Sequence, residues 1–174
     1  HTGAGMSPAA GVAAGLSDGI SPERTGRRLR FRYGLAAVLA LALLVRVLVI
    51  VATPHFVPAT DATDYDRIAV SLADTGGFPR SVYFTVANGP TAYRPPLFPL
   101  LLAGAYKLTG THNASARWRA GRILEALLGT GAVALIALIA LALWSPAVAL
   151  VTAAIAAIYP PLLVNDLCLL TEPL

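Results

Sequence analysis

Two charged residues of this chain stand where they could do chemistry on a substrate that carries a phosphate group. Asp61 comes directly before a short amphipathic segment, and its carboxylate could act as a general base toward a hydroxyl group. Arg94 comes directly before Pro95 and Pro96, and its planar guanidinium can donate two hydrogen bonds to a phosphate. Each has a structural alternative, because Asp61 could cap a helix and Arg94 could be a snorkelling side chain at a membrane interface.

Two further charged residues are candidates for the same site. Glu172 follows an apolar run and a proline pair, so it could be a second carboxylate facing Asp61 or an ordinary loop acid. Arg46 interrupts an apolar run, and a charge inside a membrane is costly and often functional. It could contact substrate, snorkel to the interface or pair with a carboxylate such as Glu125.

The composition is typical of a membrane protein and argues against a soluble globular domain. Of the 174 residues, 56% are hydrophobic and 13% are charged, against about 25% charged in soluble domains. The single cysteine excludes an internal disulfide. No His, Asp or Glu residues have the spacing of metal ligands, so we expect neither a metal nor a cofactor. The basic residues lack the interleaved aromatics of a nucleic-acid surface, so we expect no nucleic-acid partner.

Three apolar runs predict the transmembrane helices that must position these residues. The run over about 33–53 has the roughly 20 residues that a span needs, and five arginines before it place the N-terminus in the cytoplasm. Residues 1–32 then form a disordered tail with a basic flank. A cleaved signal peptide is the alternative, although Arg46 breaks its apolar core. Two more spans are predicted over about 123–144 and 147–165.

The polar segment over 54–122 is predicted to be a long loop with two short helices at the membrane surface. The first covers about 64–74, where Tyr65, Ile68 and Leu72 form one apolar stripe. Thr63 with Asp66 resembles a capping box at its start, and Gly76–Gly77 is a stop signal. The second covers about 96–108 and is too short to cross a bilayer.

The number of spans stays open at this level. The shortness of the 96–108 segment favours three spans, with Asp61 and Glu172 on the same outer side. The basic residues of 107–122 favour a cytoplasmic position for that stretch, which requires four spans and places Glu172 in the cytoplasm.

The order of these pieces resembles the N-terminal module of membrane glycosyltransferases of the GT-C superfamily. The group that it is most similar to contains the dolichyl-phosphate-mannose-dependent protein mannosyltransferases (glycosyltransferase family 39) and the aminoarabinose transferases. The resemblance covers about residues 33–174. It is carried by Asp61-x-x-x-Tyr65, by the stretch from Tyr93 through Arg94-Pro95-Pro96-Leu97-Phe98-Pro99-Leu100, and by Thr171–Glu172.

The resemblance implies an all-α polytopic membrane protein with three transmembrane helices and interfacial helices in a long first outer loop, here truncated. It implies an inverting hexosyltransferase or mannosyltransferase in the plasma (inner) membrane. The donor is a polyprenyl-phosphate-linked sugar, and the acceptor is a hydroxyl of a protein, lipid or polysaccharide. Asp61 would be the general base, Arg94 would contact the donor phosphate and Glu172 would support the reaction. Many relatives carry a second acid where this chain has Ala62.

The resemblance also assigns substrate-binding roles to neighbours of these residues. Tyr93, Tyr65 and Arg46 are the further candidates for contacts with substrate. We expect the chain to be an N-terminal piece that is inactive by itself. The alternative is a fragment of a polytopic transporter or flippase, which would use Arg46 and leave the loop acids as solvated surface.

Overall fold

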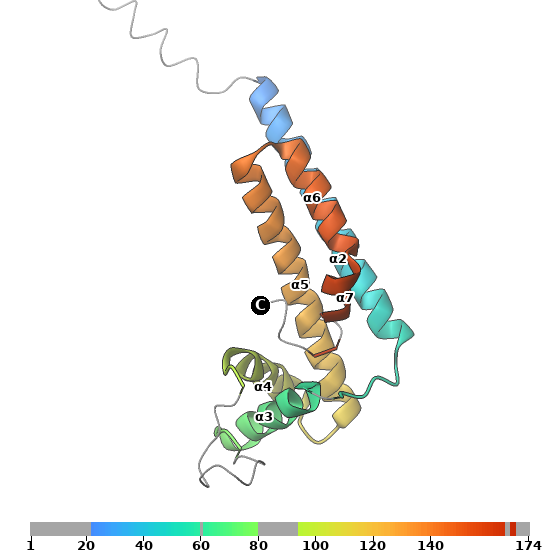
Figure 1. The fold of residues 1–174 in the computed structure, drawn as a ribbon, viewed down its shortest axis with the longest axis vertical. Coiled ribbons are helices and arrows are strands. Elements are labelled where there is room, and N and C mark those ends of the chain that lie inside the picture. The colour runs from blue at the N-terminus through green and yellow to red at the C-terminus, as the bar shows by residue number, and fades with distance from the viewer. Residues whose placement is uncertain (1–21, 60, 80–93, 166–167, 170–174) are drawn as a thin grey trace, which may run out of the picture.

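The chain folds into helices that form a long bundle with a short helical pair across one end. The computed structural model describes residues 22–59, 61–79, 94–165 and 168–169, and these contain helices and no strand. In Figure 1, α2 (Pro22–Ala52), α5 (Ala114–Leu143) and α6 (Pro146–Ile158) run side by side. The pair α3 (Asp61–Thr75) and α4 (Leu97–Thr109) packs at the end where α5 begins, and the short α7 (Pro160–Asn165) follows α6.

Two helices, Thr25–Ala52 and Ala114–Leu143, are long and apolar enough to cross a membrane. Both extend beyond the predicted spans at their N-terminal ends. Residues 22–32 are helical where the sequence predicted a disordered flank, because arginine is a good helix former and continues the helix. The second helix begins at Ala114 because Asn113 caps it: its Oδ1 accepts a hydrogen bond from the backbone N–H of Ala116 at 3.1 Å.

The third predicted span, over 147–165, is a broken helix rather than one continuous helix. It begins at the cap residue Ser145, and α6 ends at Ile158 after 13 residues. Tyr159 takes an extended conformation before α7 starts at Pro160. Pro160 and Pro161 have no backbone N–H, so an α-helix cannot supply hydrogen-bond donors to the carbonyls four residues earlier.

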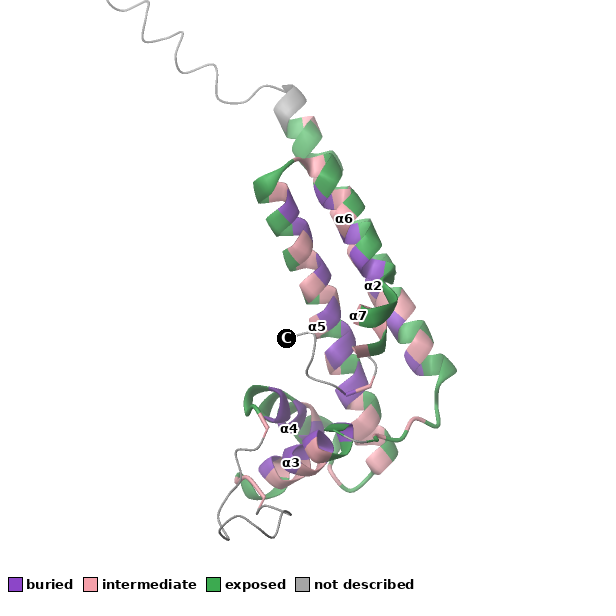
Figure 2. Cartoon of the chain, viewed as in Figure 1, coloured by how far each residue is buried: buried purple, intermediate pink, exposed green. Residues whose placement is uncertain are grey.

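The bundle core is made of small side chains that let the helices approach closely. Ala42, Val133, Ala137, Ala153 and Ala157 have no exposed surface. Small residues at such contacts are typical of helices packed in membranes. Figure 2 shows buried residues on the inner faces of α2, α5 and α6 and exposed residues on the outer faces. Many of the outward residues are large and apolar, including Leu44, Leu138 and Ile155.

The helical pair α3–α4 buries the apolar stripe that the sequence predicted. Tyr65, Ile68 and Leu72 are 2–6% exposed, and they belong to one core with Phe98 and Leu102 of α4. The helix is therefore confirmed, but its apolar face packs on protein. The packing of this stripe on α4 was not predicted, and the position of the helix at a membrane surface stays a prediction.

The start of α3 differs from the predicted capping box, whereas its end is at the predicted glycine. The helix begins at Asp61, and the Thr63 hydroxyl donates a hydrogen bond to the Pro58 carbonyl at 3.2 Å. The predicted capping box is therefore wrong, since Thr63 lies inside the first turn and Asp66 bonds elsewhere. Gly76 ends the helix with φ +73° and donates its N–H to the Leu72 carbonyl at 3.1 Å, as its residue type predicted.

Candidate functional site

The two residues singled out from the sequence, Asp61 and Arg94, contact each other directly. Arg94 Nη1 donates to Asp61 Oδ2 at 3.0 Å, and Arg94 Nη2 donates to Asp61 Oδ1. The same Nη2 donates to Asp64 Oδ2 at 3.2 Å. The hydrogen bond to Asp61 raises the pKa of Arg94 above its ordinary value, with a smaller contribution from Asp64. The guanidinium is therefore a permanent cation held between two carboxylates.

Local structure explains why these residues meet. Asp61 and Asp64 lie in the first turn of α3, where carboxylates are stabilised by the positive end of the helix dipole. Arg94 stands just before the two prolines that lead into α4, and Pro96 occupies the position directly before the first residue of this helix. Because α3 and α4 pack along each other, the start of α3 and the entry to α4 come together.

Tyr65 completes this cluster and fixes the position of the guanidinium. Arg94 Cζ lies 5.4 Å from the centre of the Tyr65 ring, within the range of a cation–π contact. The Tyr65 ring meets Phe98 edge to face, with 5.3 Å between ring centroids. The aromatic pair thus forms an apolar floor under Arg94, and the sequence-predicted residues Asp61, Tyr65 and Arg94 form one group.

The exposure of the two partners differs in a way that matters for chemistry. The Asp61 side chain is 51% exposed, whereas the Arg94 side chain is 17% exposed. A hydroxyl-bearing molecule can therefore reach Asp61 from solvent. A phosphate group matches the same two-pronged face of the guanidinium that now contacts Asp61. A phosphate on Arg94 would compete with Asp61 and leave its carboxylate available as a proton acceptor.

The other predicted site residues are not part of this group. Tyr93 and Glu172 lie outside the described residues. Arg46 lies in the bundle, fully buried, and donates through Nη1 to the carbonyls of Ala42 at 3.1 Å and Ala157 at 3.5 Å. The Ala157 carbonyl lacks its helical donor because Pro161 has no N–H. Arg46 thus satisfies a backbone acceptor at the break between α6 and α7.

A second polar network, which sequence reasoning did not identify, ties the helical pair to α5. Asp66 accepts hydrogen bonds from Arg117 Nε at 3.0 Å, from Arg117 Nη2 at 2.9 Å and from the Tyr106 hydroxyl at 2.9 Å. Asp66 is 8% exposed and Tyr106 is fully buried. Burial, together with the charge of Asp66, raises the pKa of Tyr106 well above its ordinary value.

The sequence offered only a weak signal for this network. Asp66 looked like a helix-capping acid, and Arg117 looked like one of several basic residues in a polar stretch. Their pairing spans 51 positions along the chain, and it needs the α3–α4 pair to be docked on α5. The acidic Asp66 beside the apolar stripe of a predicted helix was the sequence pattern that pointed to this network.

The described residues contain no group of three or more His, Cys, Asp or Glu side chains placed to hold a metal ion. Comparison with known proteins identifies no relative: no family model, no curated protein and no solved structure matches the chain.

Proposed function

We propose that this chain is part of a membrane enzyme that transfers a sugar from a polyprenyl-phosphate-linked donor to an acceptor hydroxyl. The observation that carries the proposal is the contact between Asp61 and Arg94. Residue type alone suggested Asp61 as a base for the hydroxyl and, independently, Arg94 as a cation that binds the phosphate. The structure has them 33 positions apart in sequence and within hydrogen-bond distance.

In the proposed reaction, the donor phosphate takes Arg94 from Asp61 when the donor binds. Asp61 then accepts the proton of the acceptor hydroxyl, and the hydroxyl oxygen forms a bond to the anomeric carbon. The bond from that carbon to the phosphate oxygen breaks, and the electron pair leaves with the lipid phosphate. Arg94 stabilises the charge that develops there. Attack opposite the leaving group inverts the anomeric centre.

Asp64 and Tyr65 have supporting roles in this proposal. Asp64 bonds Arg94 at 3.2 Å, and Tyr65 lies beneath its guanidinium. These contacts keep Arg94 near the helix start after Asp61 is released from it. The arginine therefore has to shift by only a small side-chain rotation between its carboxylate partner and the phosphate.

We propose a membrane arrangement with three crossings, in which α2, α5 and the broken helix α6–α7 span the bilayer. Figure 1 has α4 across the end of the bundle rather than along it, which favours three crossings over four. The arginines at the start of α2 then lie in the cytoplasm, and the α3–α4 pair lies at the outer face. Single cysteines at Thr171 and at Thr75, an exposed residue at the end of α3, in a Cys168→Ser background, should both react with an impermeant thiol reagent from outside. Labelling of Thr171→Cys only after membrane permeabilisation would contradict this arrangement.

The reaction is tested by measuring sugar transfer in membranes that contain the full-length protein. Asp61→Asn should lower the transfer rate by about 10²–10⁴-fold, the contribution of a positioned general base. Asp74→Asn is the matched control, because Asp74 lies on the same helix and bonds only the Thr111 hydroxyl, at 2.7 Å, among the contacts described for it. Normal transfer by Asp61→Asn would overturn the assignment, whichever sugar is used.

A transport function has one observation in its favour. Arg46 is a buried charge beside an interrupted helix, and interrupted helices line the binding sites of many transporters. The hydrogen bond of Arg46 to the Ala157 carbonyl gives it a structural role without a transported substrate. Uptake of a lipid-linked sugar by vesicles that contain the Asp61→Asn protein, with no transfer product in the wild type, would support transport instead.

A further inference from the structure

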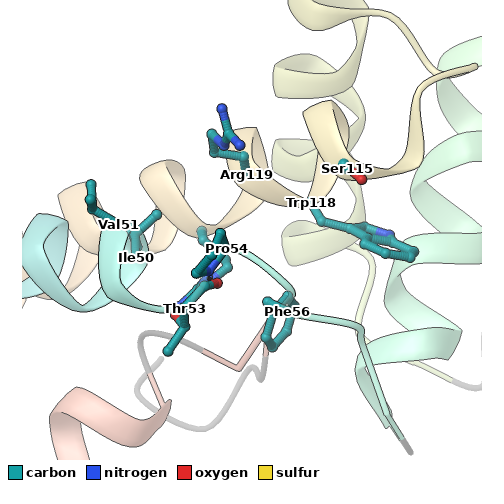
Figure 3. Close-up of a pocket in the computed structure, with 9 residues that line it drawn as sticks. Ile50, Val51, Thr53, Pro54, Phe56, Ser115, Trp118 and Arg119 are labelled. Atoms are coloured by element: carbon teal, nitrogen blue, oxygen red, sulfur yellow. Dashed lines mark hydrogen bonds between the residues drawn. The ribbon is translucent and has the colours of Figure 1, made fainter.

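A pocket at the junction of α2 and α5 is a second place where the chain presents positive charge. It has a volume of about 240 Å³ and is distinct from the Asp61–Arg94 cluster. Figure 3 shows Ile50 and Val51 on one wall, Ser115 and Arg119 on the opposite helix, and Phe56 on the segment between them. The pocket lining includes two arginines, Arg119 and Arg122, and no carboxylate.

The polar wall of this pocket is a single stripe of α5. Ser115, Trp118, Arg119 and Arg122 all line the pocket, and their spacing of three, four and seven positions puts them on one helix face. This face points toward the last turn of α2, where Val51 is 70% exposed. The pocket therefore has an apolar wall from α2 and a wall from α5 that carries two arginines.

Arg122 is built into the floor of the pocket. It is 4% exposed, and it donates to the Thr53 carbonyl at 3.1 Å and to the Thr53 hydroxyl at 2.7 Å. Its Cζ lies 4.6 Å from the centre of the Phe56 ring. Arg119 is exposed, and it forms no ion pair with any residue in the described part of the chain. A buried cation and an exposed one thus lie on the same face of α5.

The position of these arginines in a membrane needs an explanation. They lie at the end of α5 that is opposite to the arginine-rich start of α2 (Figure 1). Positive residues are expected mainly on the cytoplasmic side, so two arginines at the other end of the bundle work against the preferred orientation. Arg117 on the same helix is accounted for by Asp66, whereas Arg119 has no such acid among the described residues. A negatively charged ligand at the interface would account for Arg119.

We propose that this pocket binds the phosphate headgroup of a membrane lipid. The phosphate would lie between Arg119 and Arg122, with the Ser115 hydroxyl as a further donor, and the lipid chain would run along Ile50 and Val51. Trp118 suits this depth, because indole rings favour the boundary between headgroups and chains. A phospholipid and a polyprenyl phosphate share this headgroup chemistry. The proposal requires the chain to lie in a membrane, and it does not depend on sugar transfer.

Tryptophan fluorescence gives a direct test. The chain has two tryptophans, so Trp144→Phe leaves Trp118 as a reporter inside the pocket. The Trp144→Phe chain is reconstituted in phosphatidylcholine vesicles that contain a small fraction of either brominated phosphatidic acid or brominated phosphatidylcholine. Quenching by the two brominated lipids gives their relative binding constants next to Trp118. We expect phosphatidic acid to be preferred about tenfold.

Variants then separate a specific site from general attraction to anionic lipid. Arg119→Gln should lower the preference for phosphatidic acid about fivefold, since one arginine near a membrane surface contributes about that factor. Arg32→Gln is the matched control: it removes an exposed arginine at the other end of α2 and should leave quenching of Trp118 unchanged. Circular dichroism checks that both variants keep the helix content of the parent. Equal quenching by the two lipids, or an Arg119→Gln chain with an unchanged preference, would overturn the proposal.

Competition identifies the source of the phosphate. Displacement of the brominated lipid by a few mole per cent of polyprenyl phosphate, but not by other phospholipids, would assign the pocket to polyprenyl phosphate. Equal displacement by phosphatidylglycerol would assign it to a structural phospholipid. Displacement by millimolar inorganic phosphate in the buffer would show that a free phosphate is sufficient, and would refute the role of the lipid chain along Ile50 and Val51.

Discussion

The network of Asp66, Arg117 and Tyr106 should dominate the attachment of the α3–α4 pair to α5. Asp66 accepts both Arg117 hydrogen bonds and the Tyr106 hydroxyl at 2.9–3.0 Å. The side chains of Arg117 and Asp66 are 17% and 11% exposed, so the pair lies between a surface ion pair and a fully buried one. Surface pairs contribute about 0.2–1 kcal/mol, and removing one partner of a buried pair costs about 3–5 kcal/mol. We therefore expect Asp66→Asn or Arg117→Gln to lower the free energy of unfolding by about 2–4 kcal/mol.

The combination of the two substitutions gives the sharper test. Each single variant leaves a charge without its partner, whereas the double variant removes both charges together. The double variant should therefore lose less stability than the sum of the two single losses, by at least about 1 kcal/mol. Unfolding of the purified chain in detergent micelles, followed by circular dichroism, measures these differences. Arg119→Gln is the control and should change stability by less than about 1 kcal/mol, because Arg119 is exposed and forms no ion pair among the described residues.

Two outcomes would refute this reasoning. Single variants that lose less than 1 kcal/mol would show that solvent reaches the pair and screens it. Strictly additive losses would show that Asp66 and Arg117 act independently, in spite of the distances between them.

Three other predictions follow from single contacts. Gly121→Ala should destabilise the protein, because an added Cβ would lie 2.8 Å from Leu169 Cδ2 and 3.1 Å from Leu102 Cδ2. Gly131→Ala is the control and should not destabilise it, because a Cβ there meets nothing within 4 Å. Equal thermal stability of the two variants would contradict this prediction. Burial raises the pKa of Tyr106 above its ordinary value of 10.0, so the folded state keeps this proton at a pH where the unfolded chain loses it, and stability should fall as the pH rises above about 10. Tyr106→Phe should reduce this fall when thermal unfolding is measured over a pH series. An unchanged slope would exclude Tyr106 as its source. Arg46→Leu should destabilise the bundle, because it removes the donor to the Ala157 carbonyl. The loss of stability should be smaller in a Pro161→Ala background, where residue 161 has a backbone N–H. Identical losses in the two backgrounds would rule out this role of Arg46.

Local sequence patterns predicted the elements of this fold better than their contacts. The stripe of Tyr65, Ile68 and Leu72 predicted α3, and Gly76 predicted its end, because both signals depend only on nearby residues. The contact of this stripe with α4 was not predicted, because the sequence does not show that α4 lies across it. The two long helices also begin earlier than predicted, because the polar residues before the apolar runs belong to the same helices. Hydropathy alone does not reveal this.

For the candidate site, too, the sequence predicted individual residues but not the contacts between them. Asp61 and Arg94 were singled out by residue type and by their position before amphipathic and proline-rich segments, and the structure brings them into contact. The direct ion pair between them was not foreseen, because each residue was considered as a partner for substrate. Arg46 was considered a substrate ligand, and its bond to the Ala157 carbonyl was missed. The missing N–H of Pro161 was visible in the sequence and could have pointed to an orphaned carbonyl.

In the proposed reaction, Asp61 and Arg94 act on the same donor in one step. The most direct measurement is a double-variant cycle on kcat/KM for release of polyprenyl phosphate, with Asp61→Asn, Arg94→Gln and both together in the full-length protein. Residues that act as a unit give strongly non-additive losses. We therefore predict that the double variant is no more than about tenfold slower than the slower single variant. Losses that multiply in full, or single variants with unchanged kcat/KM, would contradict the claim.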